Sequence, residues 1–298
     1  MLLAFSGVKK GFGMFLIVGY VIILASALGT YAMHGNLLAL WVPLEYVAIF
    51  GLTIGGFIAG NNLKVIKATV AAVPGILKGS PYNKAYYVDA LALLFEILAK
   101  VRKEGLMSIE GDIENPESSP IFSKYPNITS DHHVLDFMTD YLRMMVGGNL
   151  NTVEIETLMD VELDSHHHEM AESGHVVQKV ADATPAFGIV VAVMGVVNVM
   201  GSVGEPPAVL GKMIAGALVG TFLGIYLAYG FIAPIASLIE QKANESAVIY
   251  KMIKMVLLAS MSGYAPQVAI EFGRKAVGAH ERPSFRELEE ELKARKGK

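Results

Sequence analysis

The feature that most constrains this chain is a set of long apolar stretches. A helix that crosses a lipid bilayer needs roughly 20 consecutive, mostly apolar residues. The composition agrees with several such helices, because 53% of the 298 residues are hydrophobic and only 17% are charged, which is unusually apolar for a soluble domain. The sequence predicts four transmembrane helices, at about 14–33, 37–60, 183–203 and 213–239.

Positive charges give the predicted orientation. The turn inside each pair of apolar segments carries almost no positive charge, whereas lysines flank the outer ends, at Lys9, Lys10, Lys64, Lys67, Lys242, Lys251 and Lys254. By the positive-inside rule, both termini and the long central segment are expected in the cytoplasm. The predicted parts are an N-terminal transmembrane hairpin (1–60), a cytoplasmic domain (61–182), a C-terminal transmembrane hairpin (183–239) and a cytoplasmic tail (240–298).

The first apolar segment also has features of a secretory signal. Lys9 and Lys10 precede it, and Ala25-Ser26-Ala27 is similar to a cleavage site. The apolar run continues past that site to Met33, which favours a membrane span.

The cytoplasmic parts have the pattern of amphipathic helices. Apolar residues recur at steps of three and four along 91–101, and Gly105 follows as a helix end. The same scheme appears between Leu135 and Met145, before Gly147. Two capping pairs, Asn151 with Glu154 and Ser284 with Glu287, predict further helix starts. No alternating strand pattern is present, so the predicted fold class is all-α with a helical cytoplasmic domain.

Two prolines stand out in the C-terminal hairpin. Asp182 or Thr184 can cap the third span with Pro185 at its first helical position, where the missing N–H would have no partner. Pro234 lies inside the fourth span, where proline removes a backbone hydrogen bond and crowds the carbonyl of Gly230. The fourth span is therefore predicted to be distorted near 230–234, as an ordinary membrane-helix proline or as a hinge.

Few ionisable residues lie within the apolar segments. Glu45 is the only one at depth, and Asp182 lies at the cytoplasmic end of the third span. A self-sufficient channel would need more, so the ion-binding carboxylate is expected on another polypeptide. Small residues four apart, such as Gly220 and Gly224, predict close helix packing. Thr221 beside them can bond a helix carbonyl or face a water path.

Several functions have little support. Zero cysteines exclude disulfides and thiolate metal sites, and a net charge of −4 gives no basic surface for nucleic acid. The histidines of SHHHEMAESGH, residues 165–175, lack the spacing of a metal site, so we expect a solvated polar linker and no metal. No acid–base pair or phosphate loop indicates an enzyme or a cofactor.

Ordered motifs along nearly the whole chain resemble the MotA family of flagellar-motor stator proteins. PAFGIVVAVMGVV and GTFLGIYLAYGFIAP are similar to the third and fourth transmembrane helices of that family, and PLEYVAIFGLTIGGFIAGNN to the second. The cytoplasmic stretches AKVRKEGLMSIEGDIENPESSPIF, DYLRMMVGGNLNTVEIETLMD and EFGRKAVGAHERPSFRELEEE are similar in order and spacing.

The resemblance implies a stator in the bacterial inner membrane. Five such subunits would ring a MotB dimer, whose helices carry the ion-binding aspartates and whose periplasmic part is anchored to peptidoglycan, and ion flow would turn the ring against the rotor protein FliG. By motif match, Arg102 and Glu110 take the rotor-contacting positions, Pro185 and Pro234 the coupling prolines, and Thr221 the ion-path threonine. The uncharged wall around the partner's aspartate would include Thr184, Ala192 and Thr221.

The transported ion and the rival functions complete the prediction. Sodium-driven relatives tend to have a threonine where this chain has Ala192, so protons are favoured over sodium. A three-span ExbB- or TolQ-like energiser of envelope transport is the nearest alternative, and the four predicted spans and the GDIENP segment speak against it. A self-sufficient transporter would need polar residues or inverted repeats at mid-membrane, which the sequence lacks.

Overall fold

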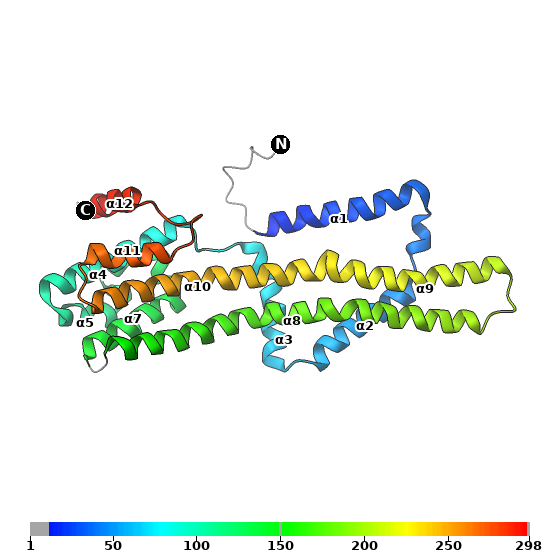
Figure 1. Ribbon diagram of the computed structural model, residues 1–298, viewed down its shortest axis with the longest axis horizontal. Coiled ribbons are helices and arrows are strands. Elements are labelled where there is room, and N and C mark those ends of the chain that lie inside the picture. Colours follow the sequence, from blue (N-terminus) through cyan, green and yellow to red (C-terminus); the bar gives the residue numbers. More distant parts are fainter. Residues whose placement is uncertain (1–11, 149–150, 297–298) are drawn as a thin grey trace. The chain divides into compact units, whose positions relative to one another are not determined.

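The computed structural model describes residues 12–148 and 151–296, so Lys9 and Lys10 lie outside the described residues. All regular structure in these ranges is helical, which confirms the predicted all-α class. The chain divides into two compact units (Figure 1). Unit 1 takes in the residues up to Gly79 together with Glu169–Lys242, and unit 2 combines Ser80–His168 with Ala243–Lys298.

Unit 1 holds the predicted membrane helices. Its elements are α1 (Phe12–His34), the 3-10 turn η1 (Leu37–Leu40), α2 (Pro43–Ala59), α3 (Leu63–Gly75), the 3-10 turn η2 (Ile76–Lys78), the second part of α8 (Thr152–Met200), α9 (Pro207–Leu227), a π-helical turn η6 (Ala228–Ile232) and the start of α10 (Ala233–Met261).

Unit 2 is a helical domain around one apolar core. It contains α4 (Lys84–Glu104), the short elements η3 (Leu106–Ile109), α5 (Glu110–Glu114), η4 (Pro116–Ser118), η5 (Phe122–Lys124) and α6 (Pro126–Thr129), then α7 (His132–Gly147), α11 (Pro266–Ala276), α12 (Phe285–Lys296) and the remaining parts of α8 and α10. Leu94 on α4, Met138 on α7 and Val256 on α10 are fully buried in this core. The tail therefore packs with the central segment in one unit, because it supplies apolar faces that the central segment needs.

The predicted helix caps are present. The Asn151 side chain accepts a hydrogen bond from the Glu154 N–H at 3.0 Å. The Glu154 carboxylate in turn accepts one from the Asn151 N–H at 2.8 Å. Ser284 and Glu287 form the same reciprocal pair at the start of α12. Gly105 ends α4 with a φ of 88°, a conformation that glycine adopts without a steric penalty. Local sequence thus specified these boundaries correctly.

Among the described residues, three helical stretches are long and apolar enough to cross a membrane: Gly13–His34, a window within α8, and a window within Pro207–Met261. The second predicted span is shorter than expected. A 3-10 turn occupies Leu37–Leu40, and α2 starts only at Pro43, with 17 residues to Ala59. The reason is local, since Pro43 has no N–H to continue a helix from the preceding residues and suits a first helical position.

The prediction that a helix begins at 183 was wrong. One α-helix, α8, runs from Thr152 to Met200 with Pro185 in its interior, so Asp182 and Thr184 cap nothing. The histidine-rich stretch at 165–175 is part of the same helix and is no linker. Good helix formers such as Glu, Met and Ala surround the histidines, and an interior proline removes only one backbone bond, which the packed helix tolerates.

Candidate functional site

The α8–α9 contact forms the centre of unit 1, and glycines make it close. A Cβ added to Gly188 would lie 2.7 Å from the carbonyl oxygen of Gly220 and 3.0 Å from Cα of Gly224. A Cβ on Gly195 would meet the Cβ of Ala217 at 2.6 Å. The packing role predicted for Gly220 and Gly224 is confirmed. Their partners Gly188 and Gly195 were missed, although their spacing of seven residues places them near one helix face.

Small residues on α2 behave differently. An added Cβ at Gly51 or Gly55 would meet nothing within 4 Å, whereas one at Gly56 would lie 3.2 Å from the ring of Phe187. No described residue therefore covers α2 at Gly51 and Gly55.

Thr184 and Pro185 lie where α8 meets α9. Thr184 is fully buried, and its hydroxyl donates to the carbonyl oxygen of Val180 at 2.6 Å. This bond to the preceding turn is the usual way for a threonine inside a helix to satisfy its hydroxyl. A Cβ on Gly224 would lie 3.1 Å from the carbonyl oxygen of Thr184, which shows how closely α9 approaches this turn. Pro185 follows directly and is half-buried.

Ala192 and Thr221 lie at the same helix contact, one heptad along α8 from Pro185. A Cβ on Gly220 would approach the backbone nitrogen of Ala192 to 3.3 Å, and Thr221 follows Gly220 in sequence. Both Ala192 and Thr221 are half-buried. The structure thus brings Thr184, Pro185, Ala192 and Thr221 together along one helix pair. No acidic or basic residue occurs in 184–200 or in 213–227.

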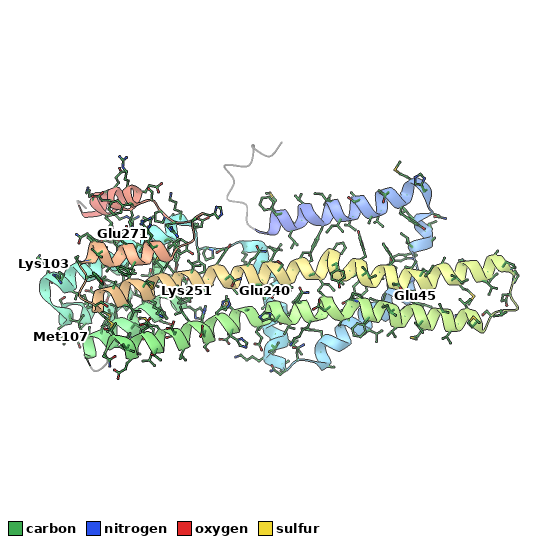
Figure 2. The ribbon with its side chains drawn as sticks, viewed as in Figure 1. Glu45, Lys103, Met107, Glu240, Lys251 and Glu271 are labelled. Atoms are coloured by element: carbon green, nitrogen blue, oxygen red, sulfur yellow. The ribbon has the colours of Figure 1, made fainter. Side chains whose placement is uncertain are left out.

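Glu45 and Asp182 lie outside this group of four residues at the α8–α9 contact. Glu45 is in the first turn of α2 and half-buried, and within the described residues its carboxylate makes no hydrogen bond or ion pair (Figure 2). One turn further, Ile49 is fully buried against Val191 and Leu223, which fixes α2 to the α8–α9 pair. Asp182 is exposed, and its carboxylate accepts a bond of 2.8 Å from Gln178 Nε2.

Pro234 follows a distorted turn, as predicted. The distortion is a π-helical turn at Ala228–Ile232, which ends with the N–H of Ala233 donating to the carbonyl of Ala228. A π-turn contains one residue more than an α-turn and is rare outside functional regions. The proline was recognised from the sequence, but the extra residue was not, because it depends on the helix register.

Arg102 and Glu110 occupy the two sides of the turn between α4 and α5. Arg102 is in the last turn of α4, and Glu110 is the first residue of α5. Both are exposed, and in the part of the chain that the structure describes neither side chain takes part in an ion pair or hydrogen bond. Lys103 and Met107, labelled in Figure 2, lie between them at one end of unit 2. Met107 is 63% exposed, so this end presents charges around an apolar side chain.

A buried carboxylate fixes this turn. Asp112 is 6% exposed and accepts bonds from Lys100 Nζ at 2.7 Å and from Ser119 Oγ at 2.6 Å. Lys100 is on α4 and Ser119 follows η4, so one side chain connects α4, α5 and the next loop. A charged group with satisfied hydrogen bonds holds its neighbours more strongly than a neutral one. The sequence offered no periodic signal for Asp112, because it lies in a short, irregular segment.

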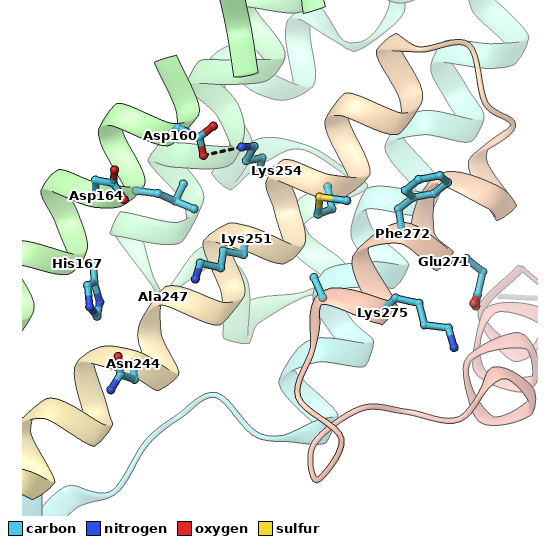
Figure 3. A pocket seen from close by; sticks show the side chains of 13 residues that line it. Asp160, Asp164, His167, Asn244, Ala247, Lys251, Lys254, Glu271, Phe272 and Lys275 are labelled. Atoms are coloured by element: carbon cyan, nitrogen blue, oxygen red, sulfur yellow. Dashed lines mark hydrogen bonds and ion pairs between the residues drawn. The ribbon is translucent and has the colours of Figure 1, made fainter. Parts of the chain in front are cut away.

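Unit 2 also contains a groove of about 800 Å³ between α8, α10 and α11 (Figure 3). Asp164, His167 and Lys251 line one part of it, and Phe272 lines another. Among the described residues, no cluster of three or more His, Cys, Asp or Glu could hold a metal ion. His175, elsewhere on α8, faces Glu240 with Nδ1 and Oε1 3.2 Å apart.

Comparison with known proteins places the chain in a family. The family description "Motility protein A N-terminal" matches residues 17–105, and "MotA/TolQ/ExbB proton channel family" matches residues 130–252. Motility protein A of Escherichia coli (strain K12) is 50% identical over 282 residues, which cover 94% of this chain and 96% of the relative. The chain belongs to the motility protein A family.

Two further relatives agree with this MotA-family assignment. Motility protein A of Salmonella typhimurium is 49% identical over 94% of this chain and 96% of its own. The fold is similar to that of the solved structure of C. jejuni MotAB, with a TM-score of 0.73 at 19% identity, covering 91% of this chain and 98% of that one. The predicted resemblance is therefore confirmed. The family is one of proton channels, which confirms that this chain is no enzyme and is a multi-pass inner-membrane protein.

Proposed function

We propose that this MotA-family chain is a stator subunit of the flagellar motor. It assembles as a ring, with five copies around a MotB dimer, and proton flow past the ring turns it against FliG of the rotor. The family assignment supports this role, since the N-terminal match is to motility protein A itself and the curated relatives with 49–50% identity carry that name. It also disfavours an ExbB- or TolQ-like energiser.

The observation that carries the proposal is the uncharged α8–α9 wall. Thr184, Ala192 and Thr221 lie along closely packed parts of α8 and α9, and residues 184–200 and 213–227 contain no carboxylate to bind an ion. A transported proton must pause on an ionisable group, and a carboxylate in the membrane is costly unless it is functional. The aspartate of a partner helix supplies that group, and the wall of each subunit faces it in turn.

Protons suit this wall better than sodium. A sodium ion needs several oxygen ligands in place of its hydration shell. Ala192 carries no side-chain oxygen, and Thr184 is fully buried, so its hydroxyl oxygen is not accessible to an ion. A proton needs only the carboxylate and a chain of water. Each charge that crosses 100 mV releases about 2.3 kcal/mol, which limits one ion to a step between arrangements of nearly equal energy.

The proposed topology has four spans and cytoplasmic termini. The apolar parts of α1, α2 and α8 form three spans, the stretch from α9 through η6 to the start of α10 forms the fourth, and unit 2 lies in the cytoplasm. Lysines at the inner ends support this orientation: Lys64 pairs with Glu169 at 3.0 Å, and Lys242 Nζ donates to the carbonyl of Gly75 at 3.0 Å. Unit 2 then presents Arg102 and Glu110 to the rotor.

Torque measurements test the function. Cells that lack their own stator receive this chain with its cognate partner, and the rotation of tethered cells is recorded while the proton and sodium gradients are collapsed separately. We expect rotation to stop on proton collapse and to be indifferent to sodium. Sodium dependence would overturn the ion assignment alone. Absence of rotation with verified membrane expression would favour the energiser.

Two variants test the roles of single residues. Pro185→Leu is expected to abolish torque and leave assembly with the partner intact, so normal swimming of this variant would contradict its role in coupling. Arg102→Glu is expected to weaken engagement of the rotor without blocking ion flow. Lys103→Glu is the matched control, because Lys103 is equally exposed one position along α4. Equal torque in the two charge reversals would contradict the assignment of Arg102.

A further inference from the structure

The turn before Pro234 has a backbone carbonyl that its own helix leaves without a donor. Pro234 carries no N–H. In an α-register that N–H would bond the carbonyl of Gly230, and in the π-register of Ala228–Ile232 it would bond that of Tyr229. The turn therefore has one backbone hydrogen bond fewer than a regular helical turn.

Two tyrosine hydroxyls connect this turn to α1 in opposite directions. The Tyr20 hydroxyl donates to the carbonyl oxygen of Phe231 at 2.7 Å. The Tyr226 hydroxyl, two residues before η6, donates to the carbonyl oxygen of Ile23 at 3.2 Å. Since Tyr20 and Ile23 are one helical turn apart on α1, the two bonds form a closed pair across the same helix contact. We call Tyr20 and Tyr226 the tyrosine pair.

Aromatic packing fixes the geometry of the tyrosine pair. The ring of Phe231 lies 4.9 Å from that of Tyr20 and 5.4 Å from that of Tyr226, measured between centroids. Phe231 is thus held on both sides, and its carbonyl is presented to Tyr20. By contrast, Ile17, Val21 and Ile22 on α1 are each more than half exposed. The tyrosine pair is a specific contact on a helix that is otherwise loosely packed.

Space beside the proline lets the turn change shape. An apolar recess of about 310 Å³ lies between α1 and α10, lined by Gly19, Tyr20, Pro234 and Leu238 among others. The Pro234 ring is therefore not packed tightly against α1. The recess leaves room for the Pro234 ring to shift if the register of η6 changes.

We propose that Tyr20 and Tyr226 are positioning residues for the conformational step of the motor. Their reciprocal bonds to the backbone hold the π-helical turn next to Pro234, and they make α1 move with that turn. The inference rests on the proposed stator function. Inside a membrane no water replaces a lost partner, so removal of a hydroxyl changes the balance between two arrangements of the turn.

Removal of single hydroxyls tests the tyrosine pair. Tyr20→Phe and Tyr226→Phe keep the rings and lose the bonds. Tyr229→Phe is the matched control, since Tyr229 lies in the same turn, is 60% exposed, and its hydroxyl makes no hydrogen bond in the described structure. The chain is expressed in cells that lack their own stator, and the rotation speed is recorded as stators join the motor one at a time. The number of speed steps gives the number of engaged stators, and the height of a step gives the output of one stator.

A typical hydrogen bond inside a membrane protein shifts a two-state equilibrium roughly threefold. We expect Tyr20→Phe to change the rotation rate per stator at low load by about that factor, with an unchanged number of steps. The double variant is expected to add little to the larger single effect, because both bonds serve one contact. Fewer steps of normal height, or an equal effect in Tyr229→Phe, would overturn the proposal.

A second measurement does not depend on rotation. In the purified complex, amides of residues 228–236 are expected to exchange hydrogen faster in Tyr20→Phe than in the unaltered protein or in Tyr229→Phe. Unchanged hydrogen exchange would contradict the positioning role of the tyrosine pair even if the motor turns. Failure of the unaltered protein to rotate, with the expected difference in exchange, would instead count against the stator function and leave the contact standing.

Discussion

The two units of this protein solve the burial of apolar surface in different ways. In unit 2, α4 buries one side chain after another, and its residues Leu91, Leu93 and Leu94 are fully inaccessible. In unit 1, only 6% of the apolar window of α1 is buried inside the chain, and Val47 on α2 is 71% exposed. Unit 2 therefore has its core within the chain, whereas unit 1 depends on lipid and on other chains.

Polar groups show the same contrast. Unit 2 anchors its loops with charged pairs such as Lys100 with Asp112. Unit 1 relies on glycine contacts and on hydroxyls that bond backbone carbonyls, as Thr184 does. Water is absent from the lipid interior, so a buried charge there has no alternative partner, while small residues let backbones approach at no electrostatic cost. The four predictions below test this contrast.

The largest effect is expected from Gly188→Val in unit 1. Its side chain would enter the space of the Gly220 carbonyl, 2.7 Å from the added Cβ, and backbone cannot yield as a flexible side chain does. We expect almost no assembled complex, measured by co-purification with the partner from membranes. Gly51→Val is the control, because an added Cβ there meets nothing within 4 Å. Equal loss in the control would show that another chain covers α2.

Truncation in the core of unit 2 is expected to have the next largest effect. Leu94→Ala removes a fully buried side chain and should lower the free energy of unfolding by about 3 kcal/mol. Ile22→Ala on α1 removes a side chain that is 59% exposed and should cost less than about 0.5 kcal/mol in detergent. Thermal unfolding followed by circular dichroism compares the two. Similar costs would refute the contrast between the units.

Loss of the buried carboxylate is expected to loosen the turn between α4 and α5. Asp112→Asn weakens the bonds from Lys100 and Ser119, at a cost of about 1–2 kcal/mol. Proteolysis within residues 105–119 should become faster, with the rest of unit 2 protected. Glu104→Gln is the control, because its pair with Lys103 is exposed and 3.9 Å long. An unchanged cleavage rate in Asp112→Asn would contradict the anchoring role.

The smallest expected effect is a pH dependence in the stability of α12, the last helix. Hydrogen bonds from Lys84 and Ser284 lower the pKa of Glu287 from 4.5 to about 2. A carboxyl with a lower pKa in the folded state stabilises that state above its unfolded pKa, and the contribution is lost as the pH falls through the folded pKa. Hydrogen exchange in α12, corrected for intrinsic rates, should therefore rise as the pH decreases from about 4.5 towards 2.

Glu287→Gln should remove this pH dependence, and Glu290→Gln, an exposed neighbour on α12, should retain it. The same pH profile in both variants would assign the effect to another group.

The sequence determined the features that depend on neighbours within a few residues. The apolar runs, the caps at Asn151 and Ser284, the stop at Gly105 and the distortion at Pro234 were all predicted, because helix periodicity and capping act over one or two turns. The family motifs added the proposed rotor contacts of Arg102 and Glu110, which periodicity alone leaves as surface charges.

Only the tertiary structure decided how those elements join. α8 continues through Pro185, because packing compensates for the one lost backbone hydrogen bond. The local sequence pattern instead predicted that a helix starts at this proline. The bond between Lys100 and Asp112 joins residues that are 12 positions apart in the sequence. The two bonds of the tyrosine pair join residues more than 200 positions apart. Such contacts have no period in the sequence, and their energy depends on whether distant backbones approach within hydrogen-bond distance, which only the folded chain specifies.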